Sequence, residues 1–86
     1  MPSYPTLKQT EVISILKFLG FTQIREKGSH KQFNHPDGRH TTVATHSSRD
    51  VYYQMIAQIA NDIRMHPKDF IALKSRKNRK VFKKSD

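Results

Sequence analysis

The chain of 86 residues contains no cysteine and only seven Asp and Glu residues. Without cysteine, a disulfide framework and a thiolate zinc site are excluded. No apolar run approaches the roughly 20 residues that span a bilayer, and the opening stretch MPSYPTLKQT lacks the basic and apolar regions of a signal peptide. We therefore expect a cytoplasmic protein that does not associate with a membrane.

Basic residues dominate the remaining composition. Sixteen Lys and Arg residues give the chain a formal net charge of +9. On a chain long enough for one small domain, this charge favours a polyanionic partner, with nucleic acid ahead of an acidic protein or a membrane surface. Six of the basic residues fall in SRKNRKVFKKSD, residues 75–86. We predict a domain over residues 1–74 and a flexible basic tail over 75–86, which either adds solubility alone or strengthens RNA binding.

Hydrophobic spacing predicts the elements of an α+β domain. Helical spacing predicts a first helix, capped by Thr6, ended by Gly20, and with its apolar face formed by Leu7, Val12, Ile13, Leu16 and Leu19. Alternation predicts three strands within residues 21–27, 30–35 and 39–45, joined by turns at 28–29 and 36–38.

Two further helices are expected after the third strand. The second should be capped by Ser48 or Asp50, and its apolar face should contain Tyr52, Met55, Ile56, Ile59 and Ile63. A short third helix is expected in HPKDFIAL, residues 66–73, with Pro67 in its first turn and Phe70 in the core.

The two turns set a strand register that can be tested. A two-residue turn at Gly28-Ser29 pairs Lys27 with His30, and Ile24 with Phe33 on the core side. A three-residue turn at 36–38 then places Thr41 opposite Phe33. Apart from Ala44, the opposite face of the sheet carries only polar side chains: Arg25, Lys27, His30, Gln32, Asn34, His40 and Thr42. A slip of one residue would bury His30 and expose Phe33.

His30 is the candidate catalytic residue on that face. Cleavage of RNA without a metal needs a base for the ribose 2′-hydroxyl and an acid for the leaving 5′ oxygen, and histidine suits either role. Gly28 lets the backbone approach a phosphate, Ser29 can donate to it, and Lys27 and Lys31 add positive charge nearby. The residues alone also permit an exposed strand histidine without a role.

The other histidines do not form a recognisable metal site. His35, His40 and His46 have no carboxylate partners at ligand spacing, and no H-x-x-x-H motif falls on a helix. We therefore expect no metal and no other cofactor. His40 or His46 remains available as a second acid or base.

Several short motifs occur together in the order found in one family. FLGF (18–21) ends the first helix, KGSHKQF (27–33) spans the first turn, HPDGR (35–39) forms the second, and TTV (41–43) follows in the third strand. Over residues 7–73 the chain thereby resembles the HicA (YcfA-like) toxins of toxin–antitoxin pairs.

The resemblance implies a fold, an activity and a partner. The fold would be double-stranded-RNA-binding-like, αβββα with a short further helix, and its three-stranded antiparallel sheet would have helices on one face. The activity would be that of an mRNA interferase acting on single-stranded or structured mRNA, with His30 as its catalytic residue. A HicB-like antitoxin would cover the basic face. The residues expected at the RNA are Arg25, Lys27, Gly28, Ser29, Lys31, Gln32, Arg39 and His40.

The chain departs from the family pattern at three places. Arg64 replaces a usual glycine, VATHSS (43–48) replaces a loop that usually contains Pro and Gly, and the basic tail extends past the usual end. Two other functions fit the same residues. One is a non-catalytic RNA- or DNA-binding module, and the other is a domain whose basic face binds an acidic protein.

Overall fold

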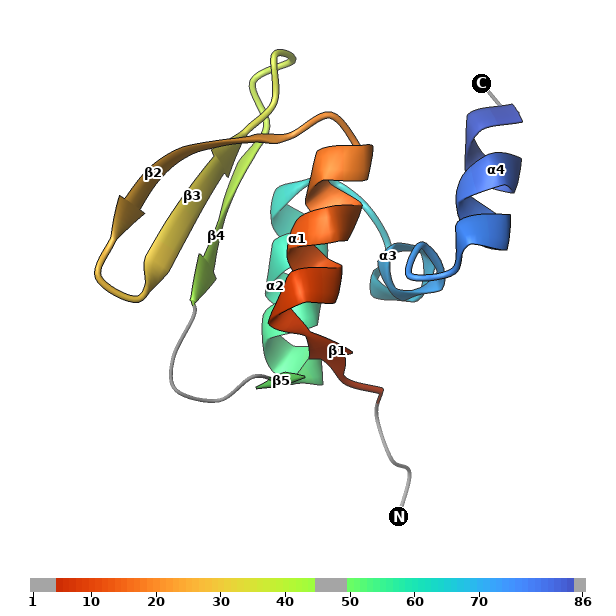
Figure 1. The fold of residues 1–86 in the computed structure, drawn as a ribbon, viewed down its shortest axis with the longest axis horizontal. Coiled ribbons are helices and arrows are strands. Elements are labelled where there is room, and N and C mark those ends of the chain that lie inside the picture. The colour runs from red at the N-terminus through yellow and green to blue at the C-terminus, as the bar shows by residue number, and fades with distance from the viewer. Residues whose placement is uncertain (1–4, 45–49, 85–86) are drawn as a thin grey trace.

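The computed structural model describes residues 5–44 and 50–84 (Figure 1). The chain order begins with β1 (Leu7–Lys8), α1 (Gln9–Phe18), β2 (Thr22–Lys27), β3 (His30–Asn34) and β4 (His40–Ala44). It continues with β5 (Asp50–Val51), α2 (Tyr53–Asp62), α3 (Pro67–Ala72) and α4 (Arg76–Lys84).

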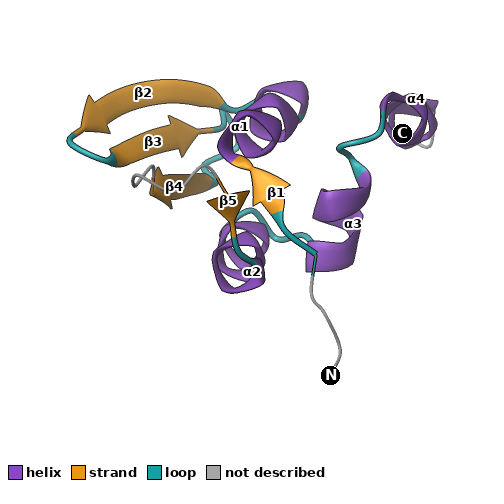
Figure 2. Cartoon of the chain, turned by 60° about the horizontal axis from the view of Figure 1, so that its bottom comes forward, coloured by secondary structure: helices purple, strands orange, loops and turns teal. Residues whose placement is uncertain are grey.

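The main sheet is antiparallel, with strand order β2-β3-β4, and α1 and α2 lie on the same side of it (Figures 1 and 2). Phe33 of β3 and Val43 of β4 are fully buried beneath these helices. The predicted α+β class and three-stranded antiparallel sheet are confirmed. The arrangement is consistent with the double-stranded-RNA-binding-like fold that the family resemblance implied.

One hydrophobic core joins the helices to the sheet. Its members are apolar and almost fully buried: Leu7, Val12, Ile15, Leu16, Phe21, Phe33, Val43, Val51, Ile56, Ile59, Ala60, Ile63, Phe70 and Leu73. The short third helix is confirmed, because Pro67 begins α3 and Phe70 packs into this core. The core therefore occupies only the helix side of the sheet and leaves its other face to solvent.

The predicted register is correct near both turns and wrong at Ile24. Lys27 pairs with His30, and Phe33 pairs with Thr41, as expected. Between Gln23 and Arg25, however, β2 contains a bulge, so that Gln23 is the residue opposite Phe33. Because a bulge adds one residue to a single strand, Ile24 leaves the pairing and is 55% exposed.

The sequence did not predict the two short strands β1 and β5, which change where α1 and α2 begin. Leu7 lies in β1, which pairs with β5, so that α1 begins at Gln9 and the expected cap at Thr6 is wrong. Asp50 lies in β5 and not at a helix cap, and Ser48 falls outside the described residues. Strands of two residues are too short to show a repeating pattern in sequence.

Tyr52, which was predicted to begin the apolar face of the second helix, was also misassigned. Tyr52 precedes α2 as its N-cap residue, where helical spacing no longer applies, and it is 61% exposed. Ile56 and Ile59, which lie within the helix, are fully buried as predicted.

The end of α1 explains the need for Gly20. The N–H of Phe21 donates to the carbonyl of Leu16 (2.9 Å), and the N–H of Gly20 donates to that of Lys17 (3.1 Å). This is a Schellman motif, in which the residue after the C-cap takes a positive φ, here +97° at Gly20. Gly20 is thus the helix terminator that the sequence predicted.

The end of α2 has the same hydrogen bonds without a glycine. The N–H of Met65 donates to the carbonyl of Ala60 (2.8 Å), and that of Arg64 donates to Asn61 (3.1 Å). Arg64 takes φ +62°, and it is the only non-glycine residue with positive φ in residues 5–44 and 50–84. Arg64 therefore adopts the backbone conformation that the family's usual glycine would adopt without strain.

The basic tail contains regular structure. Residues 76–84 form α4, which lies at the right of Figure 1. The ring of Phe82 meets that of Phe18 edge-on at 5.9 Å. The tail has an apolar contact that the surrounding Lys and Arg residues conceal in the sequence.

Candidate active site

The face of the main sheet opposite the helices is a polar surface with three rows of side chains. Pairing across the strands gives the rows Lys27–His30–Ala44, Arg25–Gln32–Thr42 and Thr22–Asn34–His40. Apart from Ala44, which is half-buried, every member is exposed, and none is acidic. We call this surface the outer face.

His30 lies on the central strand, at the end of the sheet formed by the 28–29 turn. Gly28 takes φ +59°, as the first position of a type II′ hairpin turn requires. A Cβ at Gly28 would meet nothing within 4 Å, so that the backbone beside His30 is open to a ligand. Lys27 is directly opposite His30, which places an ammonium group and an imidazole on neighbouring strands of one face.

Lys31 points to the helix side, as the register predicted. It pairs with Val43 and with Glu26, and its Nζ lies 3.8 Å from the Glu26 carboxylate. Ser29 is half-buried within the turn. Arg25, Lys27, Gly28, Ser29, His30 and Gln32 are therefore together, whereas Lys31 is next to them but turned away.

Arg39 lies at the other end of the sheet and is occupied by contacts within the protein. Its Nε donates to Asp37 (2.7 Å), and its NH1 group donates to the carbonyl of Ile63 (2.8 Å). Its guanidinium also lies 5.2 Å from the ring centre of Phe21. Arg39 thus joins the sheet to the ends of α1 and α2, and the structure does not bring it to His30.

The rest of the turn from His35 to Arg39 supports this attachment. Asp37 accepts the backbone N–H of Arg39 at 3.0 Å, as expected from an Asp in a turn, and the backbone N–H of Asp37 donates to His35 Nδ1 at 3.0 Å. The hydrogen bond from the Arg39 backbone, followed by that from the Arg39 side chain, holds the pKa of the Asp37 carboxyl below its usual value. His35 packs against Phe21 with ring centres 5.0 Å apart.

The other histidines are separated from His30. His40 is on the outer face in the row of Asn34, four residues and about 13 Å along the strand from the row of His30. His46 lies outside the described residues, as does Arg49. Within residues 5–44 and 50–84, no three His, Asp or Glu side chains gather closely enough to hold a metal ion.

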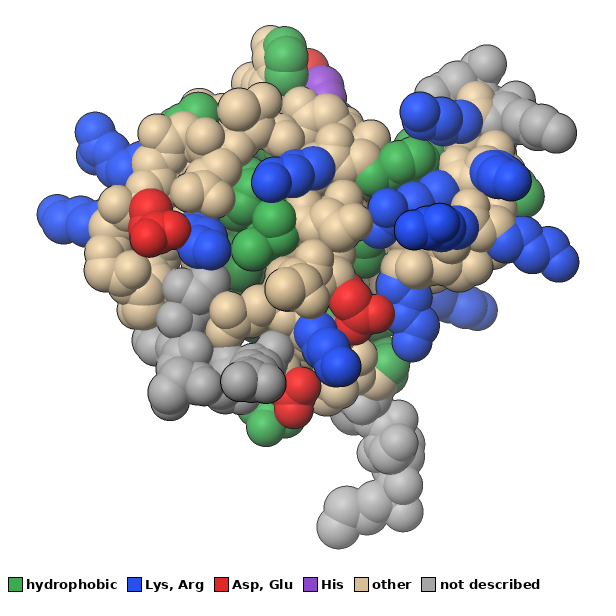
Figure 3. Space-filling view, viewed as in Figure 1, with side chains coloured by type: hydrophobic (Ala, Val, Ile, Leu, Met, Phe, Trp, Pro, Cys, Tyr) green, Lys and Arg blue, Asp and Glu red, His purple; other side chains and the backbone are tan. Residues whose placement is uncertain are grey.

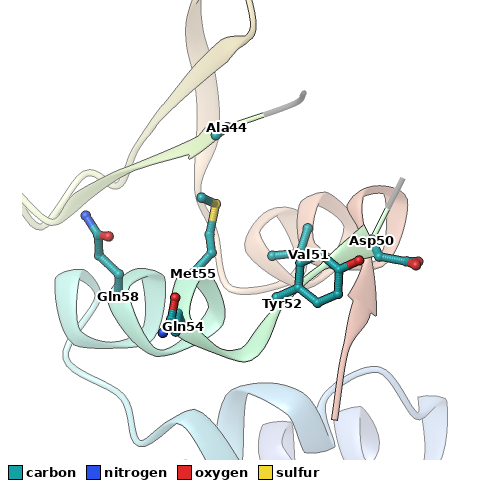
Figure 4. Close-up of a pocket in the computed structure, with 7 residues that line it drawn as sticks. All are labelled: Ala44, Asp50, Val51, Tyr52, Gln54, Met55 and Gln58. Carbon is teal, nitrogen blue, oxygen red and sulfur yellow. The ribbon is translucent and has the colours of Figure 1, made fainter. Parts of the chain in front are cut away.

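A pocket that the sequence did not indicate opens between the end of β4 and the start of α2. It has a volume of about 370 Å³ and is lined by Ala44, Asp50, Val51, Tyr52, Gln54, Met55 and Gln58 (Figure 4). Ala44 belongs to the row of His30, so the pocket adjoins the candidate catalytic row. The exposed Tyr52 was hidden in the sequence, because its spacing from Met55 and Ile56 matches a buried helix face.

Positive charge gathers at two ends of the molecule. Figure 3 shows Lys and Arg side chains over the tip of the β2–β3 hairpin and a second group over α4. Among the residues that the structure describes, no helix is long and apolar enough to cross a membrane.

Comparison with known proteins agrees with the motifs around His30. The family model described as "HicA toxin of bacterial toxin-antitoxin" matches residues 10–65, which include both sheet turns and the whole outer face. No curated protein matches the chain. Because the family model covers well over half of the chain, the chain belongs to the HicA family and is the toxin component of a toxin–antitoxin system.

Proposed function

We propose that this toxin is a metal-independent endoribonuclease that cleaves mRNA with His30 as its catalytic residue. The observation that carries the proposal is the position of His30 on the central strand of the outer face, directly opposite Lys27 and beside the open Gly28 backbone. An RNA strand can approach this face because the core and both packed helices lie on the other side.

The reaction requires two proton transfers, one from the attacking 2′-hydroxyl and one to the leaving 5′ oxygen. A base removes the proton of a ribose 2′-hydroxyl, and the 2′ oxygen attacks the adjacent phosphorus. The bond to the 5′ oxygen breaks, and an acid protonates that oxygen, which gives a 2′,3′-cyclic phosphate and a 5′-hydroxyl. His30 can perform either transfer, because imidazole gains and loses a proton near neutral pH.

The cationic neighbours would stabilise the charge that develops on phosphorus. Lys27 is in the row of His30, and Arg25 is in the next row, so that both can face the same phosphate backbone. Gln32, beside Arg25, can donate to a sugar or a base. We assign Arg39 to structural support and not to the RNA, because its guanidinium already contacts Asp37, Ile63 and Phe21.

The antitoxin expected of a toxin–antitoxin pair would inhibit by covering the outer face. A HicB-like partner with acidic side chains opposite Arg25 and Lys27 would bind quickly and exclude RNA. Reversing both charges to Glu should slow association with the antitoxin, whereas the same reversal at Lys8 and Lys68, which are exposed on β1 and α3, should not.

Cleavage of a labelled RNA in the presence of EDTA tests the activity. His30→Ala should lower the cleavage rate by about 10²- to 10⁴-fold. His40→Ala, on the same face in the far row, is the matched control and should keep most of the activity. Cleavage by His30→Ala at the rate of the unmodified toxin would refute the assignment, loss of all cleavage in EDTA would refute metal independence, and binding without cleavage would support the non-catalytic alternative.

A further inference from the structure

Helix α4 lies outside the residues that match the family and differs from the rest of the chain in charge. Six of its nine residues are Lys or Arg, and none is acidic. The ion pairs of Lys31 with Glu26 and of Arg39 with Asp37 both lie in the sheet or its turns, and neither includes a cation of α4. Like charges three and four residues apart repel one another on a helix, so that the cations of α4 destabilise it.

Contacts with the folded domain hold α4 in place. Arg79 donates to the carbonyl of Leu73 (2.7 Å) and to the hydroxyl of Ser14 in α1 (3.0 Å), and its guanidinium lies 5.3 Å from the ring centre of Phe18. Phe82 packs against the same ring. A helix of nine residues is unstable alone in water, so this docking is what keeps the cations in a fixed array.

The cations left over by the docking point to solvent. At 100° per residue, Arg76, Lys77 and Lys80 fall on one side of α4, which is opposite Phe82 and borders Val81, and all three are exposed. Lys80 lies about one turn after Arg76 and Lys77. The result is a ridge of positive charge at the opposite end of the long molecular axis from the hairpin tip (Figures 1 and 3).

A groove beside this ridge offers hydrogen-bond donors as well as charge. It lies between α1 and the start of α4, has a volume of about 230 Å³, and is lined by Thr10, Glu11, Ser14, Lys74, Arg76 and Arg79. The three cations outnumber the single carboxylate, which also accepts the backbone N–H of Lys8. Two hydroxyls and three cationic groups suit an oxyanion such as a phosphate group.

We propose that α4 and this groove form a second RNA-binding surface, which holds the phosphate backbone at a distance from His30. This inference rests on the proposed ribonuclease function and extends it to residues outside the family match. RNA is favoured over an acidic protein or a membrane because the exposed ridge offers charge with little apolar area. The only apolar side chains of α4 are Val81, which is 61% exposed, and Phe82, which is 38% exposed and packs against Phe18 on the side of the helix opposite the ridge.

The test measures binding of a labelled, mixed-sequence single-stranded RNA over a salt series, with every protein carrying His30→Ala so that the RNA stays intact. Lys77→Gln/Lys80→Gln should weaken binding about tenfold and lower the slope of log K against log salt by about 1.4, or about 0.7 for each lost phosphate contact. Lys8→Gln/Lys68→Gln removes the same charge elsewhere and should keep the parental slope. Lys77→Arg/Lys80→Arg keeps the charge and should therefore also keep the parental slope.

The outcomes separate the two proposals. If the parent protein binds RNA and both Gln pairs have equal slopes, the α4 surface is wrong and the ribonuclease proposal stands. If the parent itself does not bind RNA, the ribonuclease proposal fails. If Lys77→Gln/Lys80→Gln weakens binding of polyglutamate but not of RNA, the ridge binds an acidic protein and the inference is overturned. Circular dichroism should show unchanged helix content, since replacing Lys by Gln relieves repulsion within α4.

Discussion

The two turns of the main sheet differ in how closely they contact the rest of the protein. The 28–29 turn projects from the core, a Cβ at Gly28 would touch nothing, and the residues opposite one another across it are Lys27 and His30. The 35–39 turn is attached at three points, through the contacts of His35 with Phe21, of Arg39 with Phe21 and of Arg39 with the Ile63 carbonyl.

This difference separates function from stability within one small sheet. An open turn can admit a phosphate next to His30, but it contributes little to the core. The attached turn fixes the ends of the strands that carry His30 and His40. Substitutions at the two ends should therefore have different consequences, and paired substitutions can measure the difference.

Replacing the glycine beneath the attached turn should have the largest effect on stability. Gly20→Ala forces an L side chain to φ +97° and puts its Cβ 2.9 Å from His35 Nε2. The strain and the clash together should lower the free energy of unfolding by about 3 kcal/mol. Gly28→Ala is the matched control, because φ is also positive but the space is empty, and it should cost about 1 kcal/mol. Urea unfolding measures both, and equal losses would contradict the proposed role of His35 packing.

Substituting one arginine at each end of the sheet should lower stability at the 35–39 turn and RNA binding at the 28–29 turn. Arg39→Met keeps the apolar stem but removes the bonds to Asp37 and to Ile63, and it should cost about 2 kcal/mol in urea unfolding. Arg25→Met, on the exposed outer face, should change stability by less than about 0.5 kcal/mol. It should weaken RNA binding instead. If Arg39→Met lowers RNA affinity at unchanged stability, Arg39 contacts RNA as the sequence first suggested.

The open turn was predictable from sequence because its features are local. Gly28-Ser29 sets a two-residue hairpin, and the pairing of Lys27 with His30 follows directly. The bulge at Ile24 was not predictable, because TQIREK contains a single apolar residue and only the packing of Phe33 decides the register. The position of His30 was unaffected, since the bulge lies beyond Arg25.

The attached turn was predictable in shape but not in its contacts. Asp37 and Gly38 indicated the turn, and Asp37 does accept a backbone N–H. The partners of Arg39, however, are Phe21 and Ile63, which are distant in sequence, and no local pattern reveals such contacts. The sequence therefore indicated Arg39 as a residue at the RNA and gave no sign of its contacts within the fold. The docking of α4 through Phe82 and Phe18 was missed for the same reason.

A smaller effect is expected at the helix end that the attached turn contacts. Arg64 follows Ile63, whose carbonyl accepts from Arg39, and it has φ +62°. Arg64→Gly should relieve the strain of a left-handed residue and raise the free energy of unfolding by about 1 kcal/mol. Arg64→Ala removes the same side chain without freeing the backbone and should give no gain. A gain from Ala equal to that from Gly would assign the effect to the lost charge and not to the backbone.

The smallest effect should appear only in acid, at the carboxylate of the attached turn. Asp37 has a pKa below its ordinary value of 3.8, chiefly because its carboxylate accepts the Arg39 backbone N–H. Its ionised form therefore contributes stability above that ordinary value, and the contribution is lost as the pH falls through the lowered pKa. Between about pH 5 and about pH 2, Asp37→Asn should consequently lose less stability than the unmodified protein. Thermal unfolding across this range is the measurement, and an identical slope for Asp37→Asn and the unmodified protein would show that the carboxylate does not help to attach the turn.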